Sequence, residues 1–295
     1  MGHTGKAGNG RERRGRTSLS LVVVLGGLAA LCLLPAPAQG ALIDVPLTDG
    51  NSTATVALNS QAGMHSWTVD GINQLYQQWF WYRVGNTGGE ASIDTLTLQS
   101  YSAPAGGNSL DVTYTGAAAG TTFAINISYT LYGGTPGSGS ADISENIRIY
   151  NTGSASLPMH FFQYSDFDLM GSSAGDTVEI NGPIACQTKG LTALSETSAI
   201  HQANHSEVGF YNTTLLGLDN GTPTVLNDTT GPLGPGDATW AFEWDKTINP
   251  GGVFQISKDK QITFTPGVTT PEPATMSLMA LGLAGLAMVR RRRGR

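Results

Sequence analysis

The residues best suited to chemistry lie in one stretch, from His160 to Asp168. If this stretch is a β-strand, His160, Asp166 and Asp168 share one face, because successive side chains alternate. A histidine and two carboxylates could bind a metal ion or exchange protons with a substrate. The series fails as an EF-hand loop, since Met170 stands where an oxygen ligand is needed. We expect no cofactor, keep weak calcium binding as the alternative, and take these three residues as candidates for ligand contact.

A second candidate is the aromatic run Trp79-Phe80-Trp81-Tyr82. On a strand, Trp79 and Trp81 point to one face, while Phe80 and Tyr82 point to the other. Exposed indole rings stack on the CH surfaces of sugars, so Trp79 and Trp81 are further candidates for ligand contact. Because both faces of the strand are aromatic, packing in the core is the favoured interpretation.

Two other reactive residue types are weaker candidates. His201 and His205 are four residues apart and would share one face of a helix, which is a spacing that can bind zinc. No glutamate of a zinc-protease motif lies between them, so a surface helix or loop is favoured. Cys186 has no intrachain partner once Cys32 leaves with a signal peptide, and we expect it to be a small buried apolar residue.

Strands must position these residues, because helical periodicity is scarce and strand signals are frequent. Turn pairs such as Gly133-Gly134 and Asn220-Gly221 separate them. The predicted strands are 53–58, 78–84, 93–101, 110–115, 123–132, 142–150, 158–169, 177–180, 207–211, 213–218, 238–244, 253–258 and 261–264. Residues 190–205 are the one helix candidate. We therefore predict an all-β domain over 39–264, an antiparallel β-sandwich that could extend to a large two-sheet supersandwich.

The N-terminus has the order of a secretory signal peptide. Basic residues precede an apolar stretch, residues 19–34, and Pro35-Ala36-Pro37-Ala38 offers a small-residue cleavage site. We therefore assign residues 1–38 to a signal peptide that contains a helix. The domain that follows is predicted to be exported.

The C-terminus has a second topogenic pattern. After a linker, residues 265–270, come Pro271-Glu272-Pro273, an apolar run over 274–289 and a cluster of arginines. As a helix, the run is about 24 Å long, which makes a short transmembrane span. Arginine clusters stay on the cytoplasmic side, so everything before the span is predicted to lie outside.

This tail, residues 271–295, resembles the PEP-CTERM sorting signal of Gram-negative bacteria. The resemblance rests on the tripeptide, the short apolar run and the terminal arginines together. It implies that an exosortase-type membrane enzyme processes the chain, which is held transiently in the inner membrane and then reaches the cell surface or an extracellular matrix. The sorting-signal residues are Pro271, Glu272, Pro273, Arg290, Arg291, Arg292 and Arg293.

The central domain shows a looser resemblance. Residues 125–168 are similar in strand rhythm to the large two-sheet sandwiches that include aldose epimerases. The paired histidines and the glutamate of that family are not at matching positions, so the resemblance carries no activity and no catalytic residue.

Charge limits the class of partner. The whole chain has a net charge of −6, but residues 39–270 contain six basic and twenty acidic residues, a net charge of −14. Such a domain repels phosphate backbones, so we expect no nucleic acid partner. Two hypotheses remain: a non-enzymatic adhesive or structural protein of the surface or matrix, and a secreted carbohydrate-binding or carbohydrate-active protein whose partner is extracellular polysaccharide.

Overall fold

The computed structural model describes residues 41–265. The predicted signal peptide, almost all of the linker and the sorting tail with its helix lie outside these residues. Within 41–265, no helix is both long enough and apolar enough to cross a membrane.

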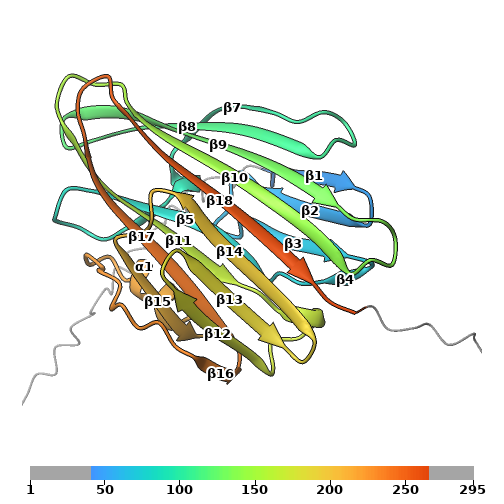
Figure 1. The fold of residues 1–295 in the computed structure, drawn as a ribbon. Helices are drawn as coiled ribbons and strands as arrows, with labels where there is room; N and C mark the ends of the chain where they lie inside the picture. Colours follow the sequence, from blue (N-terminus) through green and yellow to red (C-terminus); the bar gives the residue numbers. More distant parts are fainter. Residues whose placement is uncertain (1–40, 266–295) are drawn as a thin grey trace, which may run out of the picture. The chain divides into compact units, whose positions relative to one another are not determined.

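The described domain consists of two antiparallel β-sheets packed face to face (Figure 1), which confirms the predicted sandwich. In spatial order, sheet A contains β1 (Asp44–Asp49), β2 (Ser52–Ala57), β3 (Met64–Val69), β5 (Gln77–Val84), β11 (Leu157–Asp166), β17 (Ala238–Ile248) and β15 (His205–Phe210). The short strands β4 (Ile72–Asn73) and β6 (Ala91–Ser92) pair with β3 and β5. Sheet B contains β16 (Leu233–Gly236), β12 (Asp176–Asn181), β13 (Ile184–Lys189), β14 (Thr192–Ile200), β18 (Val253–Thr263), β10 (Ser140–Asn151), β9 (Thr121–Gly133), β8 (Ser109–Ala118) and β7 (Thr97–Ser102).

Strict alternation of side chains forms the sheet B side of the core. In β9, Phe123, Ile125 and Ile127 are buried, while the residues between them are partly exposed. The same period of two continues in β10, where Ile143 and Ile147 are buried. One apolar face and one polar face per strand are the pattern from which the sandwich was predicted.

The central strands of sheet A are buried on both faces. One face packs on sheet B, where Lys258 Nζ of β18 lies 4.9 Å from the centroid of the Phe80 ring. The other face lies under residues 211–230, which we call the covering segment. It contains the short helix α1 (Thr213–Leu218) beside β15. This double burial explains why β5, β11 and β17 carry large apolar residues without a period of two.

The sheets also enclose four charged side chains. Lys258 and Lys260 of β18 lie between Glu145 of β10 and Glu196 of β14, and all four are essentially inaccessible to solvent. Lys258 Nζ is 2.6 Å from a Glu145 oxygen and 3.1 Å from a Glu196 oxygen. Lys260 Nζ is 2.5 Å from Glu145. Two positive and two negative charges therefore compensate one another inside the sandwich.

Three local predictions are wrong. Residues 190–205 are not a helix, because β14 pairs with β13 and β18 over most of this stretch. Its inward-facing residues include Glu196 and Ser198, and these polar side chains hide the period of two. The strand predicted at 213–218 is α1, since this apolar run covers sheet A instead of pairing within it. Cys186 is exposed, because it lies on the outer face of β13.

Candidate functional site

Three aspartates converge where β11 ends and β17 begins. Asp166 is the last residue of β11, Asp168 follows it, and Asp237 directly precedes β17. Because Asp166 pairs with Thr239 in the antiparallel ladder, the strand ends meet at one edge of sheet A. One carboxylate oxygen from each aspartate lies within 4.8 Å of the other two. Antiparallel pairing thus brings together acidic residues that lie up to 71 positions apart in the sequence.

Burial changes the ionisation of this cluster. Asp166 is 1% exposed, while Asp168 and Asp237 are partly exposed. Burial raises the pKa of Asp166 to about 8, and the charges of Asp237 and Asp168 act in the same direction. Burial also raises the pKa of Asp176 to about 7, although Lys189 opposes the rise with its Nζ 3.8 Å from Asp176 Oδ1.

The aspartates form the wall of a cavity of about 170 Å³, which we call the acidic pocket. Its other lining residues are Tyr76, Ser173 and Tyr211. A second cavity of about 470 Å³, the larger pocket, shares Tyr76 and Asp168 with it. The larger pocket is also lined by His65, Asn73, Leu75 and Gln77. The two cavities therefore adjoin and present carboxylates, amides, an imidazole and aromatic rings to one space.

Two tyrosines line the acidic pocket, and main-chain hydrogen bonds attach both to the residues where β11 ends and β17 begins. The rings of Tyr76 and Tyr211 meet edge to face with centroids 6.0 Å apart, and each is roughly half exposed. The Tyr76 amide donates to the Asp166 carbonyl at 3.0 Å, and the Tyr211 amide donates to the Asp237 carbonyl at 2.8 Å. Main-chain hydrogen bonds thus position the aromatic rings against the acidic pocket.

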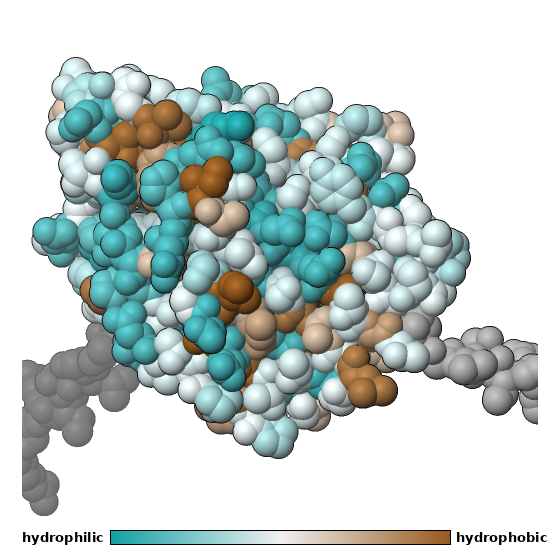
Figure 2. All heavy atoms as spheres, in the orientation of Figure 1, coloured by the Kyte–Doolittle hydropathy of each residue, from teal (hydrophilic) through white to brown (hydrophobic). Residues whose placement is uncertain are grey.

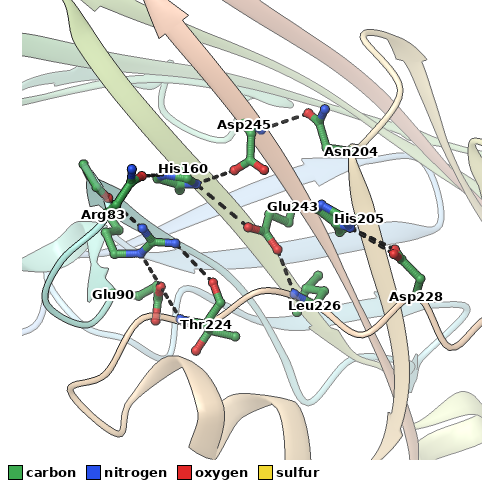
Figure 3. A network of polar contacts seen from close by, with 12 residues as sticks. Arg83, Glu90, His160, Asn204, His205, Thr224, Leu226, Asp228, Glu243 and Asp245 are labelled. Atoms are coloured by element: carbon green, nitrogen blue, oxygen red, sulfur yellow. Dashed lines mark hydrogen bonds and ion pairs between the residues drawn. The ribbon is translucent and has the colours of Figure 1, made fainter.

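A second polar cluster occupies the opposite end of β11. Figure 3 shows His160 beside Asp245 and Glu243 of the neighbouring strand β17. His160 Nδ1 contacts an oxygen of Asp245 and lies 4.0 Å from Glu243 Oε1. Burial raises the pKa of Glu243 to about 7, although its Oε2 accepts a 2.8 Å hydrogen bond from the Leu226 amide. A separate cavity of about 260 Å³ adjoins His160.

The interactions around this second cluster hold the covering segment on sheet A. Arg83 Nε donates to Glu90 Oε1 at 2.8 Å, and Arg83 Nη2 donates to the Thr224 carbonyl at 3.2 Å (Figure 3). The Thr224 amide donates to the same Glu90 oxygen at 2.9 Å. His205 Nδ1 lies 3.0 Å from Asp228 Oδ2, and this hydrogen bond raises the pKa of His205. We interpret this end of sheet A as a fastening for the segment.

The structure divides the candidates named from the sequence. Asp166 and Asp168 lie in the acidic pocket, whereas His160 belongs to the fastening. Six residues of β-strand separate His160 from Asp166 by about 20 Å, so a shared face does not make a shared site. Trp79 and Trp81 are fully buried and offer no surface to a ligand; their indole nitrogens donate to Asp94 and Asp219.

The remaining histidine pair does not converge on a common ligand position. His201 follows β14 and contacts the Gln255 carbonyl, whereas His205 begins β15 and contacts Asp228. Sequence reasoning also missed Asp237, Tyr76 and Tyr211. Only the pairing of β11 with β17 would have indicated Asp237, and no pattern in the sequence predicted that pairing.

The C-terminal region matches the family model of the PEP-CTERM protein-sorting motif over residues 269–293. The chain therefore carries this sorting signal, which marks an exported protein and implies processing by an exosortase-type enzyme. No family model assigns the central domain. No curated protein matches the chain.

Solved structures are similar to the described domain in fold. One is a candidate aldose 1-epimerase from Escherichia coli K12, with a TM-score of 0.54 and 9% identity over 76% of this chain and 100% of that chain. Another is a galactose mutarotase related enzyme from Lactobacillus acidophilus, with a TM-score of 0.52 and 8% identity over 76% and 99%. A galactose mutarotase-like protein from Clostridium acetobutylicum has a TM-score of 0.51 and 8% identity over 76% and 98%. At these identities the similarity shows a shared fold alone.

Proposed function

We propose that this exported protein is a non-enzymatic adhesive protein of the cell surface or extracellular matrix, and that its β domain binds polysaccharide through the acidic and larger pockets. The observation that carries the proposal is the pair of adjoining cavities with exposed tyrosines at the edge of sheet A. This proposal combines the two hypotheses from the sequence: an adhesive role and carbohydrate binding.

The side chains suit the two kinds of surface that a sugar presents. Tyr76 and Tyr211 offer half-exposed rings to CH groups. Asn73, Gln77 and Asp168 offer amide and carboxylate groups to sugar hydroxyls. The fold relatives support the same ligand class, because their names refer to aldose and galactose. A few polar groups around an apolar surface are typical of small-ligand sites.

The arrangement of carboxylates favours binding over glycoside hydrolysis. Glycosidases place two carboxyl groups on either side of the scissile bond, with about 5 Å or more between them. Asp166, Asp168 and Asp237 instead bring single oxygens within 4.8 Å of one another and line the same small cavity.

A matched pair of tyrosine variants tests the proposal. Tyr76 and Tyr132 are both 51% exposed, but Tyr132 lies on β9 of sheet B. On a glycan array, we expect the native protein to bind a defined set of polysaccharides. Tyr76→Ala should weaken binding about tenfold, which corresponds to about 1.4 kcal/mol for a lost ring contact. Tyr132→Ala should bind like the native protein.

Two results would contradict the proposal. One is the absence of binding to any glycan by the native protein. The other is an equal loss of affinity in Tyr76→Ala and Tyr132→Ala, which would show that the pockets are not the binding site.

A further inference from the structure

The acidic pocket contains a buried carboxylate oxygen that no group within residues 41–265 satisfies. Asp166 is 1% exposed, and within residues 41–265 its Oδ1 has no hydrogen-bond partner. Its Oδ2 has only the Tyr164 hydroxyl, at a long 3.4 Å. Buried carboxylate oxygens are costly unless a donor or a cation compensates them. Because Asp166 also lines the acidic pocket, its free oxygen is available to a bound ion.

Within residues 41–265, no protein cation is in contact with the three aspartates, although the charge of Lys189 opposes the rise that burial causes in the pKa of Asp168. Within residues 41–265, no lysine, arginine or histidine nitrogen lies within 4.0 Å of a carboxylate oxygen of Asp166, Asp168 or Asp237. The nearby Lys189 is paired with Asp176 instead, at 3.8 Å. Three carboxylates that lie this close repel one another strongly when they are ionised.

The spacing of the oxygens allows one calcium ion to contact all three aspartates. Calcium binds oxygen at about 2.4 Å, so two ligands on opposite sides of the ion are about 4.8 Å apart. The oxygens of Asp166, Asp168 and Asp237 lie within 4.8 Å of one another. We propose that these three aspartates bind one calcium ion in the acidic pocket.

The donor set favours calcium over other metals. All three ligands are carboxylates, and hard oxygen ligands without sulfur or imidazole suit calcium or magnesium better than zinc or copper. The cavity of about 170 Å³ has space for water molecules that complete the coordination. Calcium accepts six to eight oxygens in an irregular arrangement, whereas magnesium requires a near-ideal octahedron. We therefore assign ligands that come from one loop and two strand ends to calcium, which does not require an exact octahedron.

Calorimetry of the full-length protein tests the site directly. The protein is treated with a chelator, exchanged into chelator-free buffer and titrated with calcium chloride. We expect one site per chain with a dissociation constant on the order of 10⁻⁵ to 10⁻³ M. Asp237→Asn removes one ligand charge at a partly exposed position and should weaken calcium binding at least tenfold. Asp168→Asn should have the same effect, and it provides a second test of the site if Asp237→Asn does not fold.

The control is Asp142→Asn, which neutralises an aspartate beside Asp259 on sheet B and should bind calcium like the native protein. Thermal unfolding in the presence of chelator verifies that every variant is folded. The proposal is overturned if the native protein shows no saturable calcium binding, or if folded Asp237→Asn and Asp168→Asn both bind as tightly as the native protein. Calcium binding without glycan binding would retain this site and count against the carbohydrate proposal alone.

Discussion

Glu243 is an ionisable side chain at the centre of sheet A with no access to solvent. Its surroundings have mixed charge. His160 lies at 4.0 Å, Asp245 raises its pKa, and Arg83 and His205 lower it. Burial is the largest influence and raises the pKa to about 7. We therefore expect the fastening of the covering segment to depend on pH.

At the residue scale, we predict that the free energy of unfolding depends on pH through Glu243. The pKa of Glu243 rises from 4.5 to about 7 on folding, so between these pH values the folded protein holds a proton that the unfolded chain releases. The contribution to the free energy of unfolding is present below about pH 4.5 and is lost as the pH rises to about 7. At about 1.4 kcal/mol per pKa unit, it amounts to about 3 kcal/mol.

Urea unfolding at pH 5 and pH 7.5 measures this contribution. Glu243→Gln keeps an acceptor for the Leu226 amide but cannot ionise, so its free energy of unfolding should fall less than that of the native protein. Both proteins are measured with chelator present, so that bound metal does not differ between them. Equal changes in the two proteins would show that Glu243 is not the coupled group.

At the residue scale, the sequence predicted some of the candidate ligand residues, but it did not predict which of them lie together in the folded protein. Alternation in the stretch 160–168 placed His160 and Asp166 on one face, and both do lie on the outer face of sheet A. It could not show that Asp237, some 70 residues later, completes the acidic pocket. That partnership arises from the pairing of β11 with β17, which depends on the whole domain.

At the scale of elements, β10, β14 and β18 are joined by ionic contacts as well as by main-chain hydrogen bonds. Glu196 of β14 accepts hydrogen bonds from Lys258 of β18 and from Gln163 and Trp240 of sheet A. These bonds cross the interior and connect the two sheets. These bonds favour the observed register between β14 and β18, because a slip by one residue would turn these charges outward.

Removing one member of this network should be strongly destabilising. Lys260→Met leaves Glu145 and Glu196 with only Lys258 as a cation, and we expect a loss of about 3–5 kcal/mol in the free energy of unfolding. Lys246→Met is the matched control, because Lys246 is exposed on β17 and should cost less than about 1 kcal/mol. Chemical denaturation of both variants provides the comparison. A loss in Lys260→Met no larger than that of the control would contradict the structural role of the network.

Element prediction succeeded where a strand has one polar and one apolar face. The strands β9 and β10 fit this condition and lie close to their predicted ranges. The prediction failed at β14, because Glu196 and Ser198 are polar and polar residues usually lie on the surface. Both face inward, and their neighbours on β18 are Lys258 and Lys260. A local pattern cannot show that a polar side chain has a buried partner on another strand.

At the scale of the whole molecule, the domain is an acidic body with a sorting signal at its C-terminus. The four enclosed charges cancel, so the net charge of −14 over residues 39–270 belongs to the rest of the domain. Figure 2 shows one face on which hydrophobic residues occur in small groups among hydrophilic ones. A hydrophilic surface suits an exported protein that meets water.

The tail leads to a prediction about sorting. We propose that Arg290, Arg291, Arg292 and Arg293 stop translocation while the tail is held in the inner membrane. Replacing all four with serine should release full-length protein into the medium, because the barrier to translocation is lost. Mass spectrometry of the C-terminus distinguishes the forms, and Arg148→Ser on β10 serves as a control. Unchanged retention of the serine variant would contradict this role, and surface-located native protein that retains Arg295 would count against processing of the tail.

The class of fold and the sorting signal followed from sequence because each rests on local patterns: alternation within strands, and a tripeptide with an apolar run and arginines. The acidic pocket and the larger pocket could not be predicted from the sequence. Their walls combine residues near positions 65–77, 166–173, 211 and 237, which become neighbours only when sheet A forms.

Hydrogen–deuterium exchange of the full-length protein, with and without the polysaccharide that binds best on the array, tests the central claim most directly. We predict that polysaccharide slows exchange in residues 73–77 and 208–212, which include the amides of Tyr76 and Tyr211. Exchange in residues 129–133 of β9, around the control Tyr132, should not change. Slower exchange confined to sheet B, or no change at either pocket at saturating polysaccharide, would contradict the proposed site.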